Sequence, residues 1–134
     1  MLNGNHKRAL VAALGEVEEQ LMFLKQLLLK TRGERLFVHL TDDFTQDQKE
    51  ELIAKIECLM DRLISLKNVF GLKASERVLR WIARASAVYL SIQLEEIKSD
   101  RLKGYGDVPT EAKGILDPAL NEMISILRQV GSII

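Results

Sequence analysis

The sequence feature that most constrains the fold is a regular spacing of apolar residues between positions 52 and 70. They recur at alternating steps of four and three, at Leu52, Ile56, Leu59, Leu63, Leu66 and Phe70. In an α-helix this spacing keeps one side apolar over about five turns. Such a helix is not stable alone in water, because its apolar side must be buried against another element. We therefore expect further helices, and we expect Leu59 and Leu63 to be buried among them.

Three other segments carry comparable apolar stripes. Residues 5–31 repeat the same steps at Leu10, Leu14, Val17, Leu21, Leu24 and Leu28. Residues 76–103, with Ser75 as the N-cap, have a broad apolar side, so we expect the most buried helix there, with Trp81 partly covered. A last helix is predicted to begin at Pro118, because Asp117 followed by proline is a favourable helix start.

Local signals mark the ends of these helices. Thr45 and Gln48 have the spacing of a capping box, in which each side chain bonds to the other residue's backbone. Gly33, Gly71 and Gly104 follow apolar stripes, where glycine often ends a helix. Residues 33–44 include apolar side chains, so we expect this connection to fold over one end of the helices, through Leu36, Phe37, Val38 and Leu40.

Together these signals predict an all-α fold. The expected architecture is a single domain over residues 1–134, an antiparallel up-down-up-down four-helix bundle. It has an apolar connection between its first two helices, and a short helix or kink before its last one. The length of 134 residues suits one domain, and 47% hydrophobic with 28% charged residues is an ordinary globular balance.

The location of the protein follows from two further observations. One cysteine cannot form a disulfide within the chain, which favours a reducing compartment and hence the cytoplasm. No stretch reaches the roughly 18 apolar residues of a membrane span, so no membrane partner is expected.

The residues that often carry chemistry are sparse. His6, His39 and Cys58 form no closely spaced pair, so we expect no metal site and no cofactor. Cys58 has no histidine near it in sequence to activate it as a nucleophile. Arg32 and His39 have a spacing found in some helical ribonucleases, and His39 is also the candidate phosphoacceptor of a phosphotransfer protein. The alternative is that His6 and His39 have only structural roles.

Basic residues cluster before and within the third predicted helix. Lys73, Arg77, Arg80 and Arg84 are expected to share one face of it. The nineteen basic and nineteen acidic residues cancel, so this face would be a local feature of a chain without net charge. It would suit an acidic partner, a phosphate or a nucleic acid. The alternative is an ordinary solvated face with local ion pairs.

The first predicted helix has more apolar residues than one stripe requires. Met22, Phe23 and Leu29 lie outside the stripe and are candidates either for a wide core contact or for self-association. The function favoured by the sequence is therefore a non-enzymatic helical interaction or oligomerisation module, a homodimer or a partner of another protein. The alternatives are a regulator that binds nucleic acid or phosphate through the basic residues, and a phosphotransfer or ribonuclease-type enzyme centred on His39.

Overall fold

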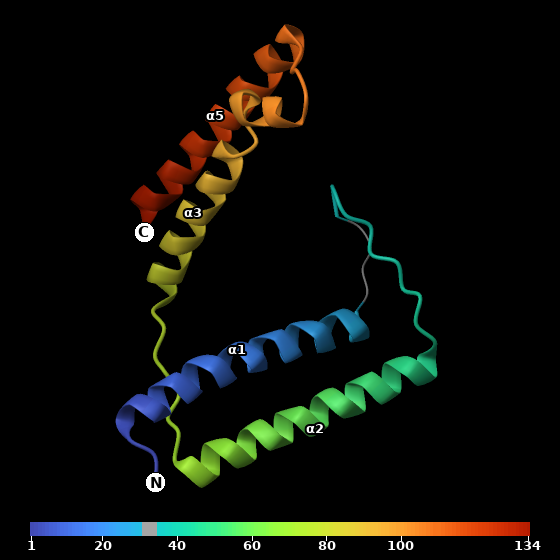
Figure 1. The fold of residues 1–134 in the computed structure, drawn as a ribbon, viewed down its shortest axis with the longest axis vertical. Helices are drawn as coiled ribbons and strands as arrows, with labels where there is room; N and C mark the ends of the chain where they lie inside the picture. The colour runs from blue at the N-terminus through green and yellow to red at the C-terminus, as the bar shows by residue number, and fades with distance from the viewer. Residues whose placement is uncertain (31–34) are drawn as a thin grey trace. The chain divides into compact units, whose positions relative to one another are not determined.

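The protein is all-helical, as predicted (Figure 1). The computed structural model describes residues 1–30 and 35–134, and no β-strand occurs in this part of the chain. The long helices are α1 (Gly4–Leu29), α2 (Gln46–Phe70), α3 (Leu79–Glu95) and α5 (Thr110–Ile133). Between α3 and α5 lie the short helix α4 (Ser99–Leu102) and the 3-10 turn η1 (Lys103–Tyr105). The chain divides into two compact units, Met1–Ser75 and Glu76–Ile134, and each is a helical hairpin.

The first hairpin consists of α1 and α2, which pack side by side in opposite directions (Figure 1). Leu28 of α1 and Ile56 of α2 are buried, and both belong to the stripes predicted from the sequence. The Lys25 ammonium lies 3.2 Å from a carboxylate oxygen of Glu57 and links the two helices at the surface. The stripes therefore meet in one seam.

The ends of this hairpin are set by local sequence signals. The Gln48 N–H donates to the Thr45 hydroxyl at 3.1 Å and the Thr45 N–H donates to the Gln48 side chain at 3.0 Å, so the predicted capping box is confirmed. Asn3 and His6 form a second capping box at the start of α1. Gly71 ends α2 with a φ of 60°, a left-handed conformation that glycine adopts without strain.

The connection before α2 differs from the prediction. Leu36 and Phe37 are 92% and 95% exposed, so they do not cover the end of the helices. The connection is instead attached by polar contacts, because the Asp42 carboxylate accepts hydrogen bonds from the Lys49 ammonium and from the Phe44 N–H. The predicted end of the first helix at Thr31 and the stop at Gly33 lie outside the described residues.

The second hairpin consists of α3 and α5, again side by side and antiparallel (Figure 1). Its core is small: Ala87 of α3 is buried with Leu120 and Ile124 of α5. The side of α3 that carries Ala87 also carries Ala83 and Ser91, and short side chains permit a close approach of two helices. The Arg84 guanidinium donates to the backbone carbonyl of Ile134, so α5 ends at the level of the second turn of α3.

α3 is shorter than predicted at both ends. It begins at Leu79 rather than directly after Ser75, and the N-cap residue Val78 provides no side-chain hydrogen bond. Val78 has extended backbone angles, φ −81° and ψ 119°, so the helical conformation begins only after it. α3 also ends at Glu95, not at Lys103.

The early end of α3 is explained by a contact between α4 and α5. The Asp117 carboxylate accepts hydrogen bonds from the Ser99 N–H at 2.9 Å and from the Ser99 hydroxyl at 2.5 Å. Ser99 is buried, and the residue before it, Lys98, is extended with φ −64° and ψ 159°. Because a new helix start is fixed at Ser99, the chain turns out of the helix between Glu95, where α3 ends, and the extended Lys98.

The predicted start of the last helix also differs from the structure, and the role of Asp117 explains the difference. α5 begins at Thr110 and Pro118 lies inside it, so the prediction of a new helix at Pro118 is wrong. Asp117 does cap a helix, but that helix is α4 rather than its own.

Two predictions of burial are also wrong. Leu59 is 51% exposed and Leu63 is half-buried, because the contact with α1 covers only part of the α2 stripe. α3 was expected to be the most buried helix, but it has one buried residue, Ala87, whereas α5 has two, Leu120 and Ile124. Trp81 is 67% exposed and is therefore partly covered, as expected.

Candidate interaction surfaces

The first hairpin has an exposed row of apolar residues on each helix, beside the more buried residues of the two stripes. On α1, Val17 and Leu24 lie three residues after the half-buried Leu14 and Leu21. On α2, Leu59 and Leu66 lie three residues after Ile56 and Leu63. Equal displacements on two antiparallel helices lead to the same side of the pair. All four side chains are exposed, so we call Val17, Leu24, Leu59 and Leu66 the first apolar face.

The second hairpin repeats this arrangement. Leu90 follows the buried Ala87 by three residues, while Met123 follows the buried Leu120 by three. Val130 lies three residues after the half-buried Leu127. By the same geometry these exposed side chains share one side of the hairpin. We call Leu90, Met123 and Val130 the second apolar face.

α3 carries a further apolar surface on the side turned away from α5. Trp81, Ala85, Val88 and Ile92 follow each other at steps of four, three and four, about 130° around the helix from the side that contacts α5. All four are exposed. We call this set the outer face of α3.

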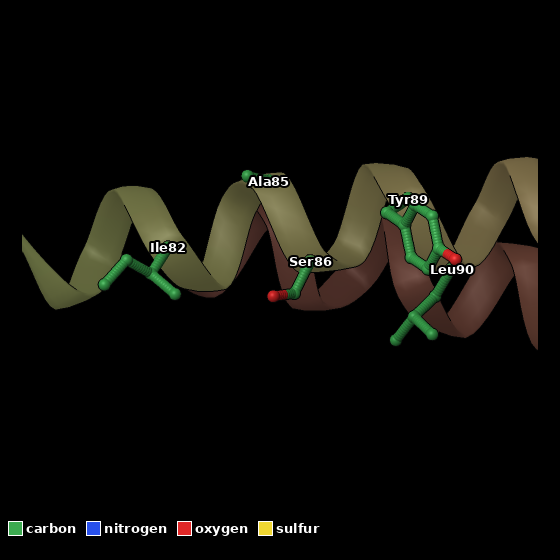
Figure 2. A pocket seen from close by; sticks show the side chains of 5 residues that line it. All are labelled: Ile82, Ala85, Ser86, Tyr89 and Leu90. Carbon is green, nitrogen blue, oxygen red and sulfur yellow. The ribbon is translucent and has the colours of Figure 1, made fainter. Parts of the chain in front are cut away.

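A shallow open hollow lies along one edge of the outer face. It is lined by Ile82, Ala85, Ser86, Tyr89 and Leu90, all from α3. Figure 2 shows Ile82 at one end and Tyr89 with Leu90 at the other, with the short side chains of Ala85 and Ser86 between them. Its lining is almost wholly apolar and holds no charged side chain, so it suits an apolar side chain of a partner rather than a polar ligand.

The predicted self-association residues on α1 are accessible. Met22, Phe23 and Leu29 are all about half exposed or more. Met22 and Leu29 lie seven residues apart and share a side of the helix, whereas Phe23 lies about 100° away from Met22. They therefore form two narrow strips rather than one patch, and their role in self-association stays a prediction.

The four basic residues do not share one helical face, which corrects the prediction. Lys73 and Arg77 precede α3 and belong to different compact units. Only Arg80 and Arg84 lie on α3, one turn apart, and Arg84 bonds to the end of α5. The physical reason is the late start of α3, which leaves the first two residues outside the helix. Binding of an anion or a partner by these residues stays a prediction.

The candidate catalytic residues are scattered. His39 is exposed in the connection, and Arg32, which gave the ribonuclease-like spacing, lies outside the described residues. Cys58 is an exposed free thiol, and His6 is engaged in the capping box of α1. In the part of the chain that the structure describes, no three His, Cys, Asp or Glu side chains are grouped so that they could hold a metal ion.

Among the described residues, two carboxylates have perturbed pKa values, and both perturbations have structural causes. The hydrogen bond from the Lys49 ammonium lowers the pKa of Asp42. The two hydrogen bonds from Ser99 lower the pKa of Asp117. Each carboxylate fixes a connection next to a helix, so neither marks a catalytic acid or base.

Sequence reasoning missed the outer face of α3, although a signal for it was present. No charged residue occurs from Ala85 to Leu94, which is ten residues and nearly three turns of helix. A helix that is uncharged on all sides over such a length is normally covered on more than one side.

Comparisons with protein-family models, curated proteins and solved structures found no match. Among the described residues, no helix combines the length and apolar character needed to cross a membrane.

Proposed function

We propose that this protein is a non-enzymatic helical interaction module that self-associates as a homodimer. The observation that carries the proposal is the number of large apolar side chains that each hairpin leaves exposed, many of them in rows along one side of a helix. Proteins that act as isolated monomers rarely keep such faces in water.

Part of this surface would be covered within the chain. We propose that the first apolar face packs against the second, which gives the antiparallel four-helix bundle expected from the four stripes. Both faces are free of charge at their centres, and each combines one row of side chains from each of its two helices. This pairing would bury Leu24 and Leu59 of one hairpin against Leu90 and Met123 of the other.

The remaining surface would be covered by a second copy. The outer face of α3 lies on a different side of its hairpin from the second apolar face, so formation of the bundle leaves it in water. Met22, Phe23 and Leu29 likewise lie off the first apolar face. These two surfaces are the candidates for the dimer interface, and a twofold contact uses the same surface of both copies.

Light scattering coupled to size-exclusion chromatography tests this function. We expect the mass of a dimer at micromolar to high micromolar concentration, in both low and high salt, because apolar association survives screening of charges. Binding of nucleic acid through the basic residues would instead give an affinity for RNA or DNA that falls steeply with salt. A protein that is monomeric at high micromolar concentration would refute the proposed homodimer.

A further inference from the structure

We propose that the homodimer forms through the outer face of α3, which packs antiparallel against the outer face of α3 in a second copy. This inference rests on the proposed function and specifies its interface. It starts from Trp81, Ala85, Val88 and Ile92, which are exposed on the side of α3 that α5 does not cover.

The sequence around this face identifies its occupant as apolar. From Ala85 to Leu94 the helix carries no charge on any side, whereas α1 and α2 carry charged residues in every turn or two. One side of this stretch contacts α5 through Ala87, Ser91 and Leu94, which are buried or half-buried. The opposite side of this stretch is equally uncharged, but no other helix of the hairpin covers it. A second helix with an equally uncharged face fits it.

The distribution of charge favours a second copy in the antiparallel direction. The amino-terminal end of α3 carries Arg80 and Arg84, and its carboxyl end carries Glu95 and Glu96, which form surface salt bridges with Lys98 and Arg101. A parallel pair would bring arginine against arginine and glutamate against glutamate. An antiparallel pair brings the basic end of each helix to the acidic end of the other, so the surface is complementary to itself.

The spacing of the side chains gives the register. The uncharged stretch is centred between Tyr89 and Leu90, and a twofold axis between Val88 and Tyr89 lies one residue before this centre, so the two stretches overlap over most of their length. Ile92 of one copy then lies opposite the small Ala85 of the other, which combines a large with a small side chain. Arg84 and Glu95 lie along the same edge of the outer face, and the same axis brings Arg84 of one copy close to Glu95 of the other.

Existing surface contacts do not oppose this pairing. Glu95 forms a salt bridge with Lys98 at 3.0 Å, three residues away on the surface. The Arg84 guanidinium bonds to the Ile134 carbonyl. The exposed Glu95–Lys98 ion pair contributes little to stability and rearranges at small cost. The Arg84 guanidinium has further N–H donors besides the one that bonds to Ile134.

Trp81 provides a direct test, because it is the one tryptophan of the chain and lies on the outer face. Samples of the full chain are diluted from high micromolar to nanomolar concentration, and mass and tryptophan emission are measured on each. We expect the mass to fall from dimer to monomer and the emission to shift to longer wavelength over the same range. A dimer whose emission stays constant while it dissociates would refute the α3 interface and leave the proposed homodimer standing.

A pair of variants separates the two candidate surfaces. Val88→Glu puts two like charges at the axis, so we expect a monomer at all concentrations, with unchanged helix content by circular dichroism. Met22→Glu combined with Phe23→Glu is the matched control and should remain a dimer. A monomeric control together with a dimeric Val88→Glu would overturn the α3 interface. A monomeric wild-type protein would overturn both this interface and the proposed function.

A charge exchange keeps the test valid should Val88→Glu fail to fold. Arg84→Glu or Glu95→Arg alone should raise the dimer Kd about tenfold, since each change affects two symmetric pairs. The double variant should restore the wild-type Kd within about threefold. Arg84 and Glu95 lie about 16 Å apart along one helix, so rescue can only come from pairing between copies. Additive losses in the double variant would refute the antiparallel arrangement.

Discussion

Replacing Ile56 with alanine tests the seam of the first hairpin. Ile56 is 4% exposed, and the change removes three carbon atoms from a buried site. At about 0.8 kcal/mol per buried carbon the transfer loss is about 2.4 kcal/mol, and the remaining cavity brings the expected loss of unfolding free energy to about 2–5 kcal/mol. Lys55→Ala on the exposed side should cost under about 0.5 kcal/mol.

Replacing Leu59 with alanine tests whether the first apolar face is covered. Leu59 is half exposed in its hairpin, so the hairpin alone predicts a loss of about 1.2 kcal/mol, half the transfer value. Packing against the second apolar face would raise the loss to about 2–5 kcal/mol. Ile64→Ala is the matched control, because Ile64 is equally exposed but lies on the opposite flank of α2. Its loss should stay near 1 kcal/mol.

The assay is equilibrium unfolding in urea, followed by circular dichroism at one protein concentration for all variants, since dimerisation makes stability depend on concentration. A Leu59→Ala loss no larger than that of Ile64→Ala would refute the packing of the two faces. An Ile56→Ala loss as small as that of Lys55→Ala would refute the seam itself.

Three further changes test individual features. Pro118→Ala should raise the unfolding free energy by up to about 3 kcal/mol, because a proline inside a helix removes a hydrogen bond; a loss measured in urea would mean that Pro118 starts a helix after all. Gly71→Ala should lower the unfolding free energy by about 1 kcal/mol, since alanine is strained at a φ of 60°, and no change in a melting curve would contradict the left-handed cap. The hydrogen bonds from Ser99 lower the pKa of Asp117 in the folded state. Their contribution to stability is therefore complete above the pKa of the unfolded chain, which is near 4, and it is lost as the pH falls through the lower pKa of the folded state. Asp117→Asn should therefore remove part of the fall in stability that wild type shows as the pH drops below about 4, and equal pH profiles of the two proteins would contradict this role.

The parts of the fold that were predictable from the sequence depend on neighbours in the chain. The capping box of Thr45 and Gln48 and the glycine end at Gly71 each involve residues within one turn, so their spacing alone identifies them. The steps of four and three correctly identified Leu28 and Ile56 as core residues, because the same rotation of the helix repeats along each stripe.

Two of the errors in helix boundaries involve contacts between residues far apart in sequence. The bonds between Ser99 and Asp117 span 18 residues, and they decide both the end of α3 and the continuity of α5 through Pro118. Local pattern also could not divide a broad stripe into its covered and uncovered rows, which is why Leu59 was expected to be buried and α3 was expected to be the most buried helix. Lys73 and Arg77 were expected on the third helix, and they lie outside it because α3 begins only at Leu79.

The measurement that tests the central claim most directly is the mass of the wild-type chain in solution as a function of concentration. The proposed interaction module predicts twice the chain mass of 15.2 kDa at high micromolar concentration, and a fall to the chain mass on dilution. A constant mass of one chain up to high micromolar concentration would contradict it.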